Sequence, residues 1–148
     1  MHPIDLRSDT VTLPTNEMLE AISKAELGDD VFQEDPTVNK LEHLAAKTFD
    51  KESAIFMPSG TMANLVAVLT HCHRGDEVIL GDQSHTFLYE AGGISSFGGV
   101  HSRQIKNYDD GTMSLEDIKN SIRKKDVHFP PSRLVCLENT HNRCFGMP

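Results

Sequence analysis

The chain has 148 residues, of which 38% are hydrophobic and 24% charged, and its formal net charge is −8. This length and composition are typical of one globular domain with its own core, and they argue against disorder. The acidic balance argues against sequence-independent binding to nucleic acid or to an anionic membrane surface, because both depend on basic patches. The longest basic run is only Arg123-Lys124-Lys125.

The sequence also indicates where the protein is found. Residues 1–7 lack the apolar stretch of a secretion signal, and no window is long and apolar enough to cross a bilayer. The cysteines Cys72, Cys136 and Cys144 are odd in number and lack the spacing of a disulfide framework. We therefore expect a cytoplasmic protein without a membrane partner.

Two helices are predicted in the first third of the chain. The first spans residues 16–25, and the second begins after Asp35, with Pro36 at its first helical position. Apolar residues recur at helical spacing in both segments. The expected buried residues are Met18, Leu19 and Ile22 in the first helix, and Val38, Leu41, Leu44, Ala45 and Phe49 in the second.

The next segment is a junction between an expected strand and an expected helix. The apolar run of residues 53–57 stops at Pro58-Ser59-Gly60-Thr61, and apolar residues then recur at i, i+3, i+4 and i+7 from Met62. Unpaired N–H groups and the positive end of a helix dipole attract an anion, and Gly60 lets a ligand approach the backbone. The junction therefore predicts a phosphate site, although Ser59 can also serve simply as a helix cap.

The rest of the chain alternates short strands and helices. Strands are predicted at 77–80, 100–105 and 134–137, with helices from near Thr86 and after the capping residue Ser114. This order favours an α/β fold with a largely parallel sheet, whose ligands bind beyond the carboxyl ends of the strands. The polar residues expected at that edge are Ser59, Gly60, Thr61, His85, Asn139, Thr140 and His141.

Several motifs together carry a family resemblance. They are residues 4–12 (IDLRSDTVT), 28–31 (GDDV), 34–37 (EDPT), 58–62 (PSGTM) and 138–143 (ENTHNR). In this order they resemble the low-specificity L-threonine aldolases over essentially the whole chain. The resemblance implies a pyridoxal 5'-phosphate enzyme that splits L-threonine or L-allo-threonine into glycine and acetaldehyde. It also implies an aspartate-aminotransferase-like (fold type I) large domain, of which residues 1–148 would be the N-terminal part, and a homotetramer at full length.

The resemblance implies roles for the cofactor-binding residues. Ser59, Gly60 and Thr61 would hold the cofactor phosphate, and His85 would stack on the pyridine ring. Asn139 is placed to reach the phenolic oxygen of the cofactor, and His128 matches a second histidine near the substrate hydroxyl. The base would be either His85 or His128, since both match family histidines. Without the resemblance, His85 would be interpreted as an ordinary surface histidine.

Three further residues match groups that line the substrate pocket. Ser8 would help to bind the substrate carboxylate, while Tyr89 and Glu90 would line the same pocket. Each residue also has a structural interpretation: Ser8 as a turn former, Tyr89 as part of the core and Glu90 as a solvated helix residue. A metal site at His71-Cys72-His73 is not expected, because adjacent helical side chains point about 100 degrees apart.

A further expectation concerns the lysine that would bind the cofactor. The resemblance places the cofactor-binding lysine, and the aspartate that pairs with the pyridine nitrogen, beyond residue 148. The lysines present are expected to lie away from the crevice, so the chain alone is expected to be inactive. The alternative function is a non-catalytic fragment that acts through subunit interaction. The eight lysines are Lys24, Lys40, Lys47, Lys51, Lys106, Lys119, Lys124 and Lys125.

Overall fold

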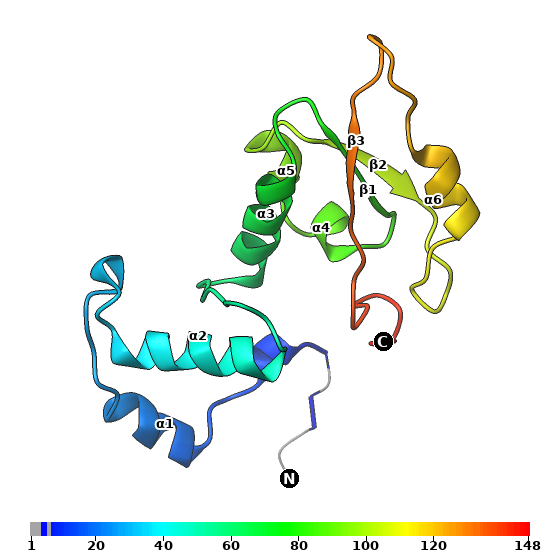
Figure 1. Cartoon of the computed structure of the whole chain (residues 1–148). Coiled ribbons are helices and arrows are strands. Elements are labelled where there is room, and N and C mark those ends of the chain that lie inside the picture. The colour runs from blue at the N-terminus through cyan, green and yellow to red at the C-terminus, as the bar shows by residue number, and fades with distance from the viewer. Residues whose placement is uncertain (1–3, 6) are drawn as a thin grey trace. The chain divides into compact units, whose positions relative to one another are not determined.

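The computed structural model describes residues 4, 5 and 7–148, which divide into two compact units, residues 1–56 and 57–148 (Figure 1). The first unit is helical. The second holds the strands of the described chain and the remaining helices. No helix within the described ranges is both long enough and apolar enough to span a bilayer.

Local capping explains the elements of the first unit. They are the short 3-10 helices η1 (Asp9–Val11) and η2 (Asp30–Phe32) and the helices α1 (Asn16–Ser23) and α2 (Pro36–Thr48). The Thr15 hydroxyl accepts the N–H of Met18 in the first turn of α1, and the Asp35 carboxylate accepts two N–H groups of α2. These bonds satisfy donors that have no partner inside a helix. The capping role predicted for Asp35 is confirmed.

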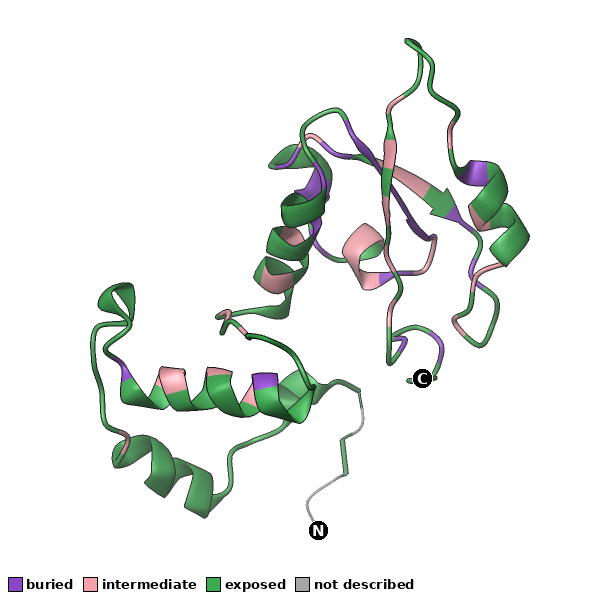
Figure 2. Cartoon of the chain, viewed as in Figure 1, coloured by how far each residue is buried: buried purple, intermediate pink, exposed green. Residues whose placement is uncertain are grey.

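The apolar faces of α1 and α2 are more exposed than their spacing predicts. Among the described residues of this unit, only Asp35 and Ala46 are buried (Figure 2). Ile22 is 67% exposed and Leu44 is 59% exposed. The buried stripes predicted for both helices are therefore wrong for this unit. Periodicity identifies a face suited to packing, but burial also needs elements that cover it.

The second unit is built on a small parallel sheet. Its strands are β1 (Glu77–Gly81), β2 (His101–Ile105) and β3 (Ser132–Val135), in the order β2-β1-β3. Glu77 pairs with His101 and with Ser132, so the strands start and end at common edges. The helices are α3 (Gly60–His71), α4 (His85–Leu88), α5 (Gly93–Ser96) and α6 (Leu115–Ser121). The predicted α/β fold with a parallel sheet is confirmed.

The strand predicted before the phosphate junction does not form. Residues 53–57 have no strand assignment, and Ile55 is 73% exposed. An extended apolar run becomes a strand only when a neighbour supplies a hydrogen-bond ladder. No described strand pairs with this run. The prediction of a strand here is therefore wrong for this structure.

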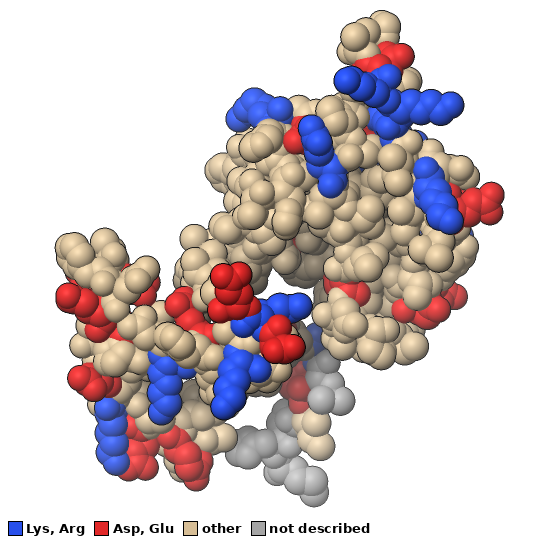
Figure 3. Space-filling view, in the orientation of Figure 1, with Lys and Arg blue, Asp and Glu red and all other residues tan. Residues whose placement is uncertain are grey.

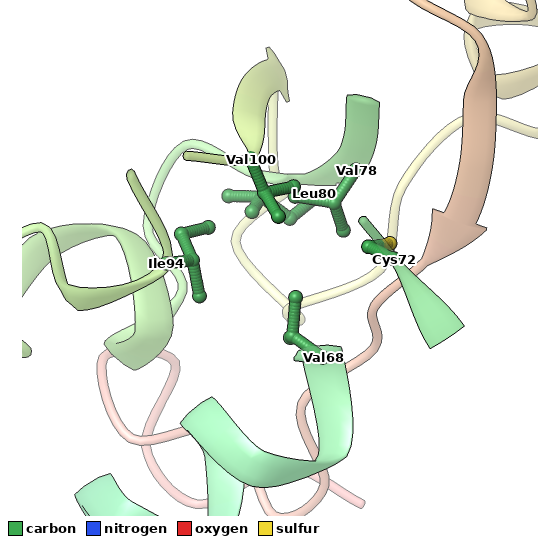
Figure 4. Packing of buried hydrophobic residues seen from close by; sticks show 6 residues of the cluster. All are labelled: Val68, Cys72, Val78, Leu80, Ile94 and Val100. Carbon is green, nitrogen blue, oxygen red and sulfur yellow. The ribbon is translucent and has the colours of Figure 1, made fainter. Parts of the chain in front are cut away.

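One apolar cluster holds the helices against the sheet. Val68 of α3 and Cys72, the residue that directly follows α3, face Val78 and Leu80 of β1 (Figure 4). Ile94 of α5 and Val100 complete the cluster and are at most 3% exposed. Successive strand residues point to opposite faces, so Ile79 is buried on the other side of β1. Figure 1 shows α3 and α5 on one side of the sheet and α6 on the other. This packing fixes the edge at which the strands end.

Charged groups on the viewed face are mixed in sign. Figure 3 shows acidic and basic side chains interspersed over each unit. The viewed face therefore has no broad basic patch of the kind that binds nucleic acid.

Candidate functional site

The carboxyl edge of the sheet gathers polar side chains from all three strands. Asn107, after β2, accepts the N–H of Gln83 at 3.0 Å and donates its amide to the Gly111 carbonyl at 2.9 Å. A Cβ on Gly81 would lie only 2.0 Å from the Asn107 Oδ1 atom. Glycine at the end of β1 therefore lets the Asn107 side chain join the loops after β1 and β2.

The N-terminus of α3 fits an anion. The Ser59 hydroxyl accepts the N–H of Met62 at 3.1 Å, so Ser59 is the helix cap. The N–H groups of Gly60 and Thr61 have no acceptor within the described part of the chain. A Cβ on Gly60 would meet no atom within 4 Å, so the space at this turn is open. The capping interpretation and the phosphate interpretation of this turn are thus compatible.

His85 lies beside this helix and is held by a buried carboxylate. Its Nδ1 atom is 2.9 Å from Glu90 Oε1, and the Glu90 side chain is 2% exposed. Asn64, on α3, donates its amide to the same oxygen at 2.6 Å. The Tyr89 ring is tilted by 53° against the imidazole, with 5.5 Å between centroids. The structure therefore brings His85, Tyr89 and Glu90 together.

Three residues at this edge were not assigned roles by sequence reasoning. Glu138 accepts the backbone N–H of His85 at 2.6 Å, and Arg143 donates to the Tyr89 hydroxyl at 2.6 Å. Asn64 is the third. Glu138 directly follows the strand predicted at 134–137, so its position was a usable signal. Asn64 and Arg143 are linked to their partners only through tertiary contacts, which spacing does not reveal.

The other predicted site residues lie elsewhere. Ser8 is in the first unit, where its hydroxyl accepts the N–H of Thr10 at 3.2 Å. His128 lies in the loop that precedes β3, where its ring contacts Asp126 at 2.8 Å and is 82% exposed. Because the strands are parallel, that loop is at the amino edge, opposite His85. The roles of Ser8 and His128 stay predictions.

A hollow of about 530 Å³ lies at the carboxyl edge, next to α6 and β3. Glu138 and Asn139 line it, with apolar residues of α6 and β3. His141 also lines it, is 1% exposed and has no partner for either ring nitrogen among the described residues. Gly60 and His85 are not among its lining residues. The largely apolar hollow and the anion-binding turn are thus separate features of this edge.

One lysine position differs from expectation. Lys106 directly follows β2, so it lies at the carboxyl edge and lines a second hollow with Asp82 and Arg143. The prediction that every lysine lies away from this edge is wrong for Lys106. Lys119 lies in α6, and Lys124 and Lys125 lie in the loop toward the amino edge.

The arrangement suits an aromatic ligand that carries a phosphate. The open first turn of α3 offers two N–H donors and a threonine hydroxyl, and the His85 ring is 40% exposed nearby. Asn64 lies four residues after Gly60, which corresponds to about 6 Å along a helix. The residues present therefore fit the pyridoxal 5'-phosphate that the resemblance implies, which Gly60, Thr61 and His85 would hold.

The parallel sheet with helices packed against it defines an α/β domain. A solved threonine aldolase from Leishmania major has a TM-score of 0.67 and 22% identity, covering 85% of this chain and 36% of that structure. A putative L-allo-threonine aldolase from Listeria monocytogenes has a TM-score of 0.59 and 26% identity, covering 72% of this chain and 30% of that structure. These likenesses confirm the predicted fold class.

The chain belongs to the beta-eliminating lyase family, whose match covers residues 5–148. It is 56% identical to low-specificity L-threonine aldolase 1 of Arabidopsis thaliana, over 99% of this chain and 42% of that protein. It is 51% identical to the low-specificity L-threonine aldolase of Escherichia coli K12, over 94% of this chain and 42% of that protein. The predicted resemblance is confirmed, and the chain spans about two fifths of the length of these relatives.

Proposed function

We propose that this chain forms the cofactor-phosphate and substrate-hydroxyl part of a pyridoxal 5'-phosphate lyase that cleaves L-threonine or L-allo-threonine to glycine and acetaldehyde. The observation that carries the proposal is the open N-terminus of α3 beside an imidazole held by a buried carboxylate. The relatives named as threonine aldolases support it at 51–56% identity. When bound, the cofactor would withdraw electrons from the substrate carbon.

The residues of α3 would bind the phosphate. Two free N–H groups and the Thr61 hydroxyl all donate, and a dianion accepts several such bonds at once. The Ser59 hydroxyl accepts the N–H of Met62 and so holds the backbone at the start of α3. Because Gly60 has no side chain, the phosphate oxygens can come within hydrogen-bond distance of the backbone.

His85 would set the orientation of the ring and receive a proton. Its ring is flat and partly exposed, and one nitrogen is engaged by Glu90. The other nitrogen, Nε2, is then the atom that can accept the proton of a substrate hydroxyl. Glu90 itself is buried and contacts His85 and Asn64. These contacts favour an indirect action of Glu90 through His85 over direct binding of the substrate.

Affinity for two related compounds tests the phosphate site. We expect pyridoxal 5'-phosphate to bind the chain at least about tenfold more tightly than pyridoxal, since a hydrogen bond to a charged group contributes about 1.5 kcal/mol or more. Thr61→Val should weaken only the phosphorylated compound. Thr70→Val, at the other end of α3, is the matched control. Equal affinity for the two compounds would contradict the proposal.

Several further properties belong to the same proposal. A cytoplasmic location is supported by the three free thiols Cys72, Cys136 and Cys144. A role in threonine breakdown and glycine formation follows from the proposed reaction. Homotetrameric assembly rests on the family resemblance alone.

A second candidate function is a non-catalytic interaction fragment. The observation that favours it is the exposed apolar face of α1, where Met18, Leu19 and Ile22 are each at least 50% exposed. Exposed apolar patches commonly mark interaction sites. Sedimentation at increasing protein concentration tests it: association that Ile22→Glu abolishes supports this function, and a monomer at every concentration contradicts it.

A further inference from the structure

One carboxylate oxygen joins α3 to the imidazole at the start of α4. Glu90 Oε1 accepts the amide of Asn64 at 2.6 Å and lies 2.9 Å from the Nδ1 atom of His85. The Glu90 side chain is 2% exposed, whereas that of His85 is 40% exposed. The imidazole is thus anchored at one nitrogen on its buried side and is accessible elsewhere.

A backbone turn brings the carboxylate to this place. Residues five apart in a regular helix lie about 140 degrees apart around the axis, so Glu90 could not face His85 if α4 continued. Instead α4 ends at Leu88, and Tyr89 has φ −123° and ψ 8°, outside the helical range. The chain thus leaves the helical path just before Glu90, and Glu90 meets the first residue of α4.

The chemistry of these groups determines which imidazole nitrogen of His85 carries the proton. An ionised carboxylate only accepts hydrogen bonds, so the nitrogen that faces Glu90 must carry the proton. A neutral imidazole has one N–H and one lone pair, and the lone pair is then on Nε2. Asn64 has an amide that donates to the same oxygen, which restrains the carboxylate from the side of α3.

We propose that Asn64 and Glu90 are positioning residues that hold His85 in the Nδ1–H form, with the Nε2 lone pair available to a ligand hydroxyl. The inference rests on the proposed function, because the ligand is that of the proposed site. In the step it supports, a proton passes from the hydroxyl oxygen to Nε2, and Glu90 faces the imidazolium that results. Helix α3 would thus set both the phosphate position and the orientation of the base.

The proton position can be measured on the chain without cofactor. The ¹⁵N shifts of the imidazole nitrogens distinguish the two neutral forms in a histidine-labelled sample at alkaline pH, and His85→Gln identifies the signal. Glu90→Ala removes the acceptor, whereas Glu90→Gln keeps an amide oxygen in its place. Asn64→Ala removes the second contact, and Asn120→Ala, an exposed asparagine of α6, is the matched control.

We expect only the Nδ1–H form of His85 in the unchanged chain, in Glu90→Gln and in Asn120→Ala. Glu90→Ala should shift His85 mainly to the Nε2–H form, and Asn64→Ala should give a mixture. An Nε2–H form in the unchanged chain, or no change in Asn64→Ala, would overturn the proposal. If Glu90→Ala does not fold, Asn64→Ala decides the outcome, because Asn64 is exposed on α3. If His85 has the Nδ1–H form but the chain binds pyridoxal 5'-phosphate and pyridoxal equally tightly, the positioning role of Asn64 and Glu90 stands and the proposed function is contradicted.

Discussion

Glu138 accepts the backbone N–H of His85 at 2.6 Å, so the loop after β3 is joined directly to the start of α4. The other oxygen of the same carboxylate accepts the N–H of Asn142 at 2.7 Å. Helix α4 is a single turn, and Ser84 at its N-cap makes no capping bond through its side chain. Glu138 therefore caps α4 from the loop that follows β3.

Removal of the Glu138 carboxylate should reduce the protection of the backbone at His85 and at Asn142. In Glu138→Ala we expect hydrogen exchange of the His85 and Asn142 amides to accelerate by about tenfold or more, since a bond to a charged group contributes about 1.5 kcal/mol. The Leu80 amide, in the middle of the sheet, should keep its rate. Glu138→Gln retains one acceptor oxygen and should preserve protection at one of the two amides. Unchanged exchange in Glu138→Ala would show that neither bond matters in solution.

Among the ion pairs of the sheet, loss of the one at Glu77, at the amino edge, should lower the free energy of unfolding most. Its side chain is fully buried, and it accepts Arg123 Nε at 2.9 Å and the Ser132 hydroxyl at 3.0 Å. Arg123→Ala removes the nearest cation from this buried carboxylate and leaves His101, 3.6 Å away, so we expect the free energy of unfolding to fall by about 3 kcal/mol. Denaturation by urea measures this change.

The matched control for Arg123 is Arg133. Its side chain is 58% exposed and its Nε atom is 3.5 Å from Asp76. Asp76 is buried, but Arg133 is exposed and its contact is long, so Arg133→Ala should lower the free energy of unfolding by about 1 kcal/mol or less. Equal losses in the two variants would contradict the distinction between the close Arg123 pair and the longer Arg133 pair.

Cys136 should be an unreactive thiol. Burial raises its pKa from 9.0 to about 11, and Cys72 and Glu90 add to the effect. The reactive species is the thiolate, and near pH 8 its fraction is then roughly a hundredfold lower than for an ordinary thiol of pKa about 9. Alkylation by iodoacetamide, followed by mass spectrometry, should be about a hundredfold slower in the folded chain than in urea. Similar rates would show that Cys136 is not buried in solution.

Asp35 should make the first unit sensitive to acid. Hydrogen bonds from the N–H groups of Val38 and Gly28 contribute most to lowering the pKa of its carboxyl group from 3.8; desolvation opposes them, and the Thr37 N–H adds a smaller lowering. A lowered pKa in the folded state means that the carboxylate stabilises the unit above pH 3.8, and that this stabilisation is lost as the pH falls through the lowered value.

Comparison of the unchanged chain with Asp35→Ala measures the contribution of the Asp35 carboxylate to the stability of the first unit. Asp35→Ala should reduce helical circular dichroism and the protection of the Thr37 and Val38 amides at neutral pH. Well below pH 3.8 the unchanged chain should lose the same protection, so the difference between the two should vanish. A difference that stays constant across this range would indicate that Asp35 acts by packing and not by its charge.

Much of the second unit could be predicted from the sequence because its signals are local. The capping residues Ser59 and Ser114 and the short apolar run at 77–80 mark elements that form, while the run predicted at 134–137 overlaps only the last two residues of β3. The position of His85 after β1 follows from the same pattern. A parallel sheet then brings these strand ends to one edge, which is why the candidate site could be located before the structure was known.

Other features depend on partners that the sequence pattern does not specify. The run at 53–57 is apolar enough for a strand but has no neighbouring strand in the described chain. Leu44 has the spacing of a core residue and is 59% exposed. Asn64 is 26 positions from Glu90, and no local pattern links them. Long-range pairing, and not local propensity, separates the correct predictions from the wrong ones.

A chemical-shift map of the backbone amides and the histidine rings, recorded while the chain is titrated with pyridoxal 5'-phosphate, tests the anion site of α3. We expect saturable shifts at the Gly60 and Thr61 amides and at the His85 ring, with inorganic phosphate reproducing only those of the α3 amides. Saturable shifts confined to the hollow beside His141, or no shift at Gly60 and Thr61 at saturation, would contradict it.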